Sequence, residues 1–236
     1  MTLDFLSPDR TEADARFALV ARSPLERQAR EAGARFQERD GWRVAASFGD
    51  PERELARCRE TVGYADRSAL GKLELQAAPG ELASLAGVSL EAATATRVSD
   101  GWWCPLAPDR ALLLVEPGAA PALRERLQES ARGADAPASV VDLTAGLAAL
   151  AVAGPLAREA FARLSALDLR PAVTPPAAFR PGSVARVPAM VLCEAPDRYL
   201  LLFGAGHAQY MWTAFADAAG HLGGGPVGTE AVAQDA

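Results

Sequence analysis

Trp102 and Trp103 are the residues of this 236-residue chain that most clearly suggest contact with a ligand. Neighbouring side chains on a strand point to opposite faces, so we expect one ring in the core and the other at a cleft or a partner. Only 6% of the residues are aromatic, and an outward tryptophan would be a suitable anchor for a flat ligand or a neighbouring subunit. Burial of both rings in the core is the alternative.

Charged residues beside turns form a second set of candidates. Asp66 precedes an alternating segment, GKLELQ at 71–76, that contains Lys72. We expect Asp66 to cap a turn and Lys72 to point to solvent from a strand, because charged residues beside turns commonly do so. The alternative is that both line a cleft. Asp100 lies in an Asp-Gly pair, which is typical of turns.

Cysteine and histidine residues form no pattern of metal ligands or nucleophiles. Cys58, Cys104 and Cys193 are far apart, and we expect them to be partly buried structural thiols. His207 and His221 flank the last predicted helix, and without carboxylate or cysteine spacing beside them we expect exposed histidines and no metal site.

Composition and charge restrict the location and the partners. The odd number of cysteines, and a start that lacks a basic region followed by an apolar run, favour a reducing cytoplasm. No segment approaches the ~20 apolar residues of a membrane span. The net charge is −6, and the arginines alternate with glutamates in helical runs, so we expect no binding of nucleic acid.

Helix and strand signals begin after a polar stretch. We expect a loose arm over 1–21 and a helix from Ser23 to about Phe36, because Ser23, Pro24 and Glu26 have the spacing of a capping box. Asp50 and Pro51 predict the start of a second helix over 50–60, after which GYADRS is expected to turn the chain.

The rest of the chain repeats one pattern. The corner APDR followed by leucines occurs at 107–114 and returns at 195–202, each time between two predicted strands. Each half is predicted to run β-α-β-β-α with a further strand, which is the ferredoxin-like unit. The sequence therefore predicts an α+β fold with two ferredoxin-like halves, 22–143 and 144–236, related by internal duplication within one domain and preceded by a helical N-terminal segment.

Ordered segments of the chain resemble the glycine cleavage T-protein (aminomethyltransferase) family. They are SPLERQAREAGARFQERDGW, CRETVGYADRSALGKLEL and LAALAVAGPLAREAFARL, and the resemblance covers about residues 22–236. The second half also resembles the gamma subunit of heterotetrameric sarcosine oxidase, a short relative. The resemblance implies that Tyr64, Asp66 and Lys72 line a central cleft, with Trp102 and Trp103 as further ligand-binding candidates. It implies tetrahydrofolate as the cofactor.

The chain departs from this family where folate would be held. The insertion that carries the family's catalytic aspartate is missing, and Asp100 is the candidate to replace it. Leu200 stands where the family has a glutamate that holds the pterin. A leucine would leave the pterin's hydrogen-bond donors without a partner, so folate-dependent transfer by this chain alone is not expected.

Two functions follow from the resemblance and the departures. In the first, the chain is an accessory subunit of a folate- and flavin-linked amine-oxidising system, with oxidase alpha and beta subunits as partners. In the second, it is a stand-alone enzyme that uses the cleft for a one-carbon or other small-molecule reaction, and its alternative partner is a second copy of itself in a homo-oligomer. A folate-dependent transferase with substituted ligands is a third.

Overall fold

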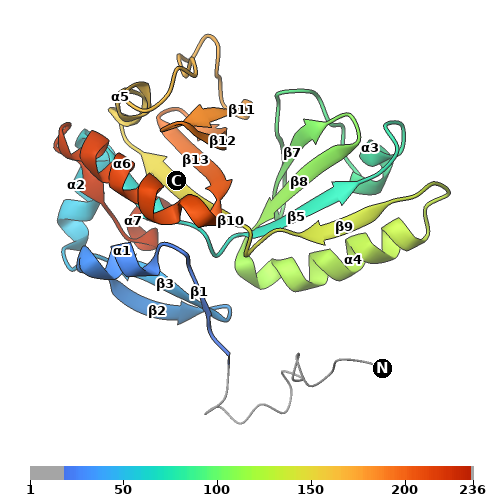
Figure 1. The fold of residues 1–236 in the computed structure, drawn as a ribbon, viewed down its shortest axis with the longest axis horizontal. Coiled ribbons are helices and arrows are strands. Elements are labelled where there is room, and N and C mark those ends of the chain that lie inside the picture. Colours follow the sequence, from blue (N-terminus) through green and yellow to red (C-terminus); the bar gives the residue numbers. More distant parts are fainter. Residues whose placement is uncertain (1–18, 235–236) are drawn as a thin grey trace.

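A computed structural model describes residues 19–234 of the chain (Figure 1). The first elements are β1 (Ala21–Arg22), α1 (Glu26–Glu31), β2 (Arg35–Arg39), β3 (Trp42–Ser47) and α2 (Pro51–Glu60). We expected a helical N-terminal segment. In the structure this segment also contains a small sheet, in which the three strands have the order β1-β3-β2. Most of the predicted arm lies outside the described residues, but Ala21 already pairs with Trp42.

The first helix is shorter than predicted because the chain reverses after it. Glu26 binds Arg30 and not the start of the helix, so the predicted capping box does not form. Gly33 has a φ of 90°, which ends the helix, and the next residues form the β2–β3 hairpin. Asp40 and Gly41 both have positive φ at its turn, as Asp-Gly hairpins require. The second helix starts as predicted, with the Asp50 carboxylate accepting from the Arg53 amide.

The first half of the chain builds a five-stranded sheet. Its elements are β5 (Gly71–Gln76), α3 (Leu82–Ala86), β6 (Thr96–Val98), β7 (Gly101–Ala107), β8 (Arg110–Val115), α4 (Ala120–Arg132) and β9 (Ser139–Asp142). The strand order is β6-β7-β8-β5-β9. Helices α3 and α4 cover one face, where Leu82, Leu123 and Leu127 join the alternate residues of the strands.

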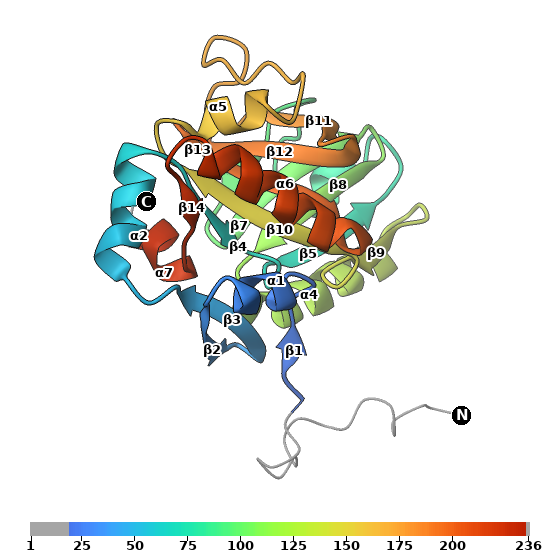
Figure 2. The ribbon, with the colours of Figure 1, turned by 60° about the vertical axis from the view of Figure 1, so that its left-hand side comes forward.

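The second half builds a six-stranded sheet. Its elements are β10 (Leu147–Ala153), α5 (Ala157–Ala162), β11 (Phe179–Val184), β12 (Val187–Ala195), β13 (Arg198–Gly204), α6 (Ala208–Gly220), β14 (Gly225–Pro226) and α7 (Thr229–Gln234). Figure 2 shows α6 lying across this sheet. Phe161 of α5 and Trp212 and Phe215 of α6 belong to one hydrophobic cluster between this sheet and its helices, which we call the outer core.

One strand of the larger sheet comes from early in the chain. The segment GYAD was expected to turn the chain, but it forms β4 (Gly63–Asp66), which pairs antiparallel with β10. The strand order is β11-β12-β13-β10-β4-β14. All four residues of β4 are buried, so a segment with the composition of a turn is held as a strand by its neighbours on both sides.

The two sheets face each other, with their helices outside. Leu112 and Leu114 of β8 share a central core with Leu200 and Leu202 of β13, while the residues between them point to the helices. The two repeated corners also have the same register, since Ala107 pairs with Arg110 and Ala195 with Arg198, each after a bulge. The repeated leucine runs therefore meet at the centre of the molecule.

Candidate functional site

A cavity of about 220 Å³ lies where the two sheets meet, and we call it the central cavity. Trp102 and Leu114 line it from the first sheet, and Glu194 and Leu200 line it from the second. The turn that carries Asp100 also contributes to its wall. The central cavity is thus the place where candidate residues from the two halves come together.

Trp102 and Trp103 point to opposite sides of β7. Trp103 is 3% exposed and lies in the core beneath α3 and α4. Trp102 lines the central cavity, and the guanidinium of Arg97 lies 4.9 Å from the centre of its ring. The indole Nε1 of Trp102 is buried and has no hydrogen-bond partner. A buried donor without a partner favours a ligand that offers an acceptor.

Asp100 is exposed at the turn between β6 and β7. Its Oδ2 accepts a hydrogen bond of 3.1 Å from the hydroxyl of Ser99. The turn brings Asp100 to the edge of the central cavity, but no buried group or charged partner sets it apart as an acid or a base. Its role as a catalytic residue stays a prediction.

Ion pairs occupy most of the other charged groups around the central cavity. Nη2 of Arg67 lies 2.6 Å from Oε1 of Glu116, and Nε of Arg198 lies 3.4 Å from Oε2 of Glu194. Cys104 is buried nearby, and burial together with the charge of Glu194 raises the pKa of its thiol. The cysteine is therefore a neutral packing group and not a nucleophile.

Asp66 lines a neighbouring cavity of about 260 Å³, the side cavity. Arg67 and Glu116 line both the side cavity and the central cavity. The Asp66 carboxylate accepts a 2.9 Å hydrogen bond from the Ser68 amide, so Asp66 does cap a turn. Burial raises its pKa, and hydrogen bonds from Ser23 and Ser68 oppose that rise.

Lys72 does not point to solvent, and the expectation that it would is wrong. Its side chain is fully buried, and Nζ donates to the carbonyl oxygens of Ser68, Leu70 and Thr144 at 2.8, 2.7 and 3.4 Å. Lys72 lies opposite Leu114 on the face of the sheet that meets the other half, which excludes water from it. The ammonium thus ties a turn to the segment after β9, and it lines neither cavity.

Tyr64 also lies away from the central cavity. Its ring is 1% exposed and meets the rings of Trp212 and Phe215 at centroid distances of 5.1 and 6.4 Å. Burial raises the pKa of its phenol, with a smaller opposing effect of Arg57. Tyr64 therefore contacts the outer core under α6, and a ligand in the central cavity would not meet it.

Glu194 is the residue that the sequence could have revealed and that we did not single out. The residue directly before the first Ala-Pro-Asp-Arg corner is Leu106, and the residue directly before the second corner is Glu194. A carboxylate in place of a leucine, next to an otherwise repeated turn, was the available signal. The positions of Arg67 and Glu116 beside both cavities depend on the packing of the halves and had no such signal.

The residues around the central cavity do not fit a pterin. Leu200 forms part of the wall, as expected from the sequence, and it offers no acceptor for the pterin's amine and ring N–H. Of the three carboxylates that line the cavity, Glu116 and Glu194 are ion-paired with Arg67 and Arg198, and Asp100 is exposed at the edge. A volume of about 220 Å³ is also below the ~300 Å³ at which small-molecule sites usually begin.

Residues 19–234 contain neither a cluster of metal ligands nor a helix that could span a membrane. Within them, no three His, Cys, Asp or Glu side chains gather closely enough to hold a metal ion. No helix in this part of the chain has the length and apolar character needed to cross a membrane. Both histidines are exposed, and the three cysteines are buried and form no disulfide.

Two solved structures show similar folds. A chain of the heterotetrameric sarcosine oxidase from Corynebacterium sp. U-96, in complex with pyrrole 2-carboxylate, aligns with 23% identity and a TM-score of 0.63 over 73% of this chain and 92% of that one. The aminomethyltransferase T of the glycine cleavage system from Bartonella henselae aligns with 18% identity and a TM-score of 0.72 over 90% of this chain, which spans 60% of that protein. No curated protein sequence matches the chain.

A family match agrees with these folds. The family described as the GCVT N-terminal domain matches residues 89–234, which is more than half of the chain. The matched residues include both repeated hairpins. They also include Trp102, Glu194 and Leu200, which line the central cavity. The chain therefore belongs to the GCVT N-terminal domain family.

Proposed function

We propose that this chain is an accessory subunit of a folate- and flavin-linked amine-oxidising system, as in the heterotetrameric sarcosine oxidase whose subunit it resembles. The observation that carries the proposal is the small central cavity, in which Leu200 and an ion-paired Glu194 replace a free pterin-binding carboxylate. A member of the family that has lost this group can still contribute its surface to an assembly. Cysteines that form no disulfide would suit a cytoplasmic location.

The arrangement of strands supports an internal duplication, which we include in the proposal. Four neighbouring strands of the first sheet lie in the order β9-β5-β8-β7. Along the chain these are the fourth, first, third and second strands of the unit, which is the arrangement of a ferredoxin-like unit. The second sheet has the order β4-β10-β13-β12, in which β4 takes the fourth place. Strand β4 lies in the first half, directly before β5, so the second unit would be completed by a strand from the first half of the chain.

Calorimetric titration with 5-formyltetrahydrofolate tests whether the chain alone is a folate enzyme. We expect no saturable binding up to about 1 mM, which corresponds to about −4 kcal/mol. Sedimentation of the chain mixed with oxidase alpha and beta subunits from the same genome tests the accessory role, and we expect a stable complex. Failure to form this complex, or folate binding near 1 µM by the chain alone, would contradict the proposal.

A stand-alone enzyme is the second candidate, and the unpartnered Nε1 of Trp102 favours it. A flat molecule with a hydrogen-bond acceptor would satisfy this donor, and Asp100 would lie at the edge of the same cavity. Such a ligand should bind about tenfold more weakly to Trp102→Phe, which keeps a ring but removes the N–H. Equal thermal shifts for wild type and this variant across a panel of heteroaromatic compounds would count against the second candidate.

A further inference from the structure

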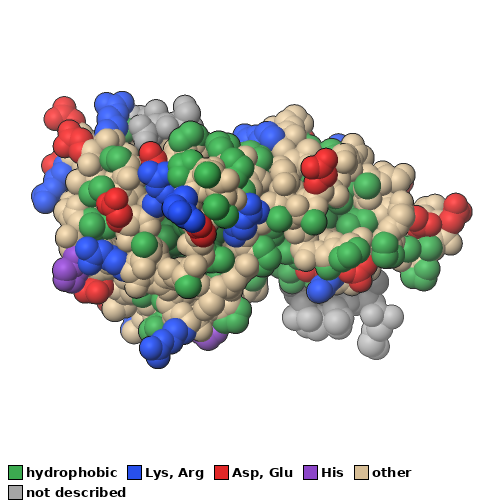
Figure 3. All heavy atoms as spheres, turned by 90° about the horizontal axis from the view of Figure 1, so that it is seen from above, with side chains coloured by type: hydrophobic (Ala, Val, Ile, Leu, Met, Phe, Trp, Pro, Cys, Tyr) green, Lys and Arg blue, Asp and Glu red, His purple; other side chains and the backbone are tan. Residues whose placement is uncertain are grey.

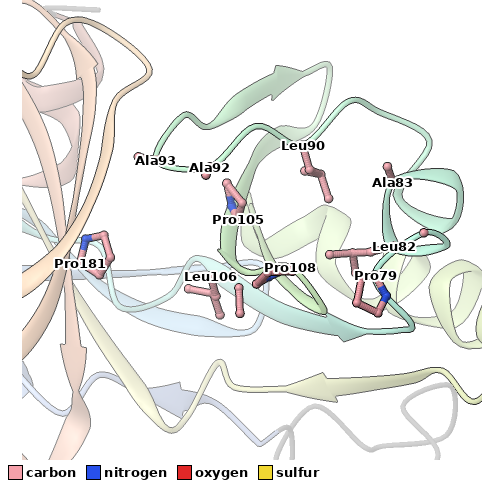
Figure 4. Close-up of a pocket in the computed structure, with 12 residues that line it drawn as sticks. Pro79, Leu82, Ala83, Leu90, Ala92, Ala93, Pro105, Leu106, Pro108 and Pro181 are labelled. Atoms are coloured by element: carbon pink, nitrogen blue, oxygen red, sulfur yellow. The ribbon is translucent and has the colours of Figure 1, made fainter.

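A cavity lined entirely by apolar residues lies away from the central cavity and shares no lining residue with it. This outer cavity has a volume of about 540 Å³, and all of its lining residues are glycine, alanine, leucine or proline. None of these side chains carries a charge or a hydrogen-bonding group. Figure 4 shows Leu82 and Leu90 pointing toward the space that Pro105 and Leu106 border from the other side.

The walls of the outer cavity come from distant segments. Leu82 and Ala83 belong to α3, Ala92 and Ala93 to the loop before β6, and Pro108 to the first repeated corner. One residue, Pro181, comes from β11 of the other half (Figure 4). The cavity therefore belongs mainly to the first half, and the second half borders it at Pro181.

Hydrogen bonds to the second half fix one wall. The Ala95 amide donates to the Ala177 carbonyl at 2.7 Å, and the Ala93 carbonyl accepts from the Phe179 amide at 2.9 Å and from Nη1 of Arg180 at 2.7 Å. Ala93 and Ala177 have φ values of 62° and 68°, a left-handed conformation that alanine rarely adopts. Strained backbone held by surrounding contacts is common where a ligand is clamped.

The shape and the chemistry of the outer cavity indicate the class of its occupant. Its volume is within the ~300–1,000 Å³ of small-molecule sites, and four prolines restrict the movement of its walls. The large hydrophobic side chains that are exposed elsewhere, such as Val141 and Tyr210, do not border it. Among the lining residues only Leu82 is buried, and Pro79, Ala83 and Pro108 are exposed, so the cavity opens to solvent and a small molecule can enter it.

We propose that the outer cavity binds a small, uncharged, apolar molecule. An ionic ligand would find no charged side chain in the cavity to pair with. An apolar ligand brings no polar group of its own that would need a hydrogen-bond partner there. Because the walls are already rigid, little conformational entropy of the protein is lost when a ligand binds. The inference is independent of the proposed function, because the outer cavity is separate from the central cavity and from any folate chemistry.

The neutral dye N-phenyl-1-naphthylamine tests this inference, because its fluorescence rises in an apolar site. We expect the full chain to bind one dye molecule with a dissociation constant of about 1–10 µM. Ala83→Phe places a ring in the cavity, and Ala92→Asp places a charge at its wall. Both residues are exposed, so these variants should fold, and each should bind the dye at least tenfold more weakly.

Ser84→Phe is the matched control for Ala83→Phe. Ser84 is exposed on the same helix and does not line the outer cavity, so this variant should bind the dye as the wild type does. Absence of saturable binding to the wild type, or unchanged binding to both cavity variants, would overturn the proposal. So would self-association of the chain that Ala92→Asp abolishes, since a second copy would then occupy the cavity.

Discussion

At the scale of single residues, Lys72 is the clearest case of a polar group placed by packing. It is the only lysine of the sequence, and its ammonium meets three backbone carbonyl oxygens while the residue is 0% exposed to solvent. Burial lowers its pKa to about 8, and the charges of Asp66 and Asp142 oppose this effect. Lys72 remains mostly protonated at pH 7, as three acceptors around Nζ require.

The lowered pKa predicts how stability changes with pH. An unfolded lysine keeps its proton up to about pH 10.5, whereas folded Lys72 loses it near pH 8. Between these values the unfolded state binds more protons, so this group makes the free energy of unfolding rise with pH, by at most about 1.4 kcal/mol per unit. The stability that Lys72 gains at high pH is therefore lost as the pH falls through 8.

Urea unfolding of the wild type and Lys72→Met at several pH values between 7.5 and 10 measures this contribution. The wild type should gain stability relative to the variant as the pH rises. The variant should be less stable at pH 7 by about 3 kcal/mol, because three carbonyl groups lose their donor. The single lysine signal in a 13C-lysine sample gives the pKa directly, and a value near 10.5 would contradict the argument.

At the scale of elements, close backbone approaches decide where some strands and helices can lie. A Cβ on Gly101, at the start of β7, would lie 1.8 Å from the carbonyl oxygen of Leu114 on β8. Gly101 also follows Asp100 and precedes Trp102, so the strand pairing that it permits positions the central cavity wall. A larger residue would separate β7 from β8.

Gly101→Ala should therefore lower the free energy of unfolding by about 2–3 kcal/mol, through strain and shifted backbone. Gly206→Ala is the control, because a Cβ on Gly206 meets no atom within 4 Å. We expect the control to change stability by less than about 1 kcal/mol. Chemical unfolding of both variants checks this expectation, and equal losses would show that the close approach has no special cost.

At the scale of the whole molecule, the two sequence halves do not coincide with the two sheets. Strand β4 lies at 63–66 but pairs with β10, and Tyr64 on it packs against Trp212 and Phe215. The division at residue 143 stays a prediction. A fragment starting at residue 144 would expose this side of β10 and of the outer core, so it would lose hydrophobic burial as well as strand pairing.

Residues 144–236 alone should therefore fail to fold cooperatively, and addition of residues 1–143 should restore the structure. Residues 1–143 contain three tryptophans and the shorter fragment contains only Trp212. We therefore replace Trp212 with 7-azatryptophan, which can be excited at longer wavelength than the other three. We expect its emission to shift to the blue when the fragments combine. A cooperative unfolding transition of residues 144–236 by themselves would show that the second unit does not need β4.

The sequence by itself determined the features that depend on neighbouring residues. Asp50 with Pro51 defines the start of α2, and the repeated APDR corners define two hairpins with the same register. Asp40 with Gly41 had an equally local signal for the β2–β3 turn, and we missed it. In such cases the side chain, the turn and the hydrogen bond lie within a few residues, so no distant contact is needed.

Only the tertiary structure decided the features that depend on contact between the halves. It buried Lys72 instead of exposing it, turned GYAD into a central strand, and placed Tyr64 away from Trp102. It also brought Glu194 to the wall that Trp102 lines. Burial and strand pairing depend on which segments meet in space, and the same local sequence is stable as a turn or as a strand according to what covers it.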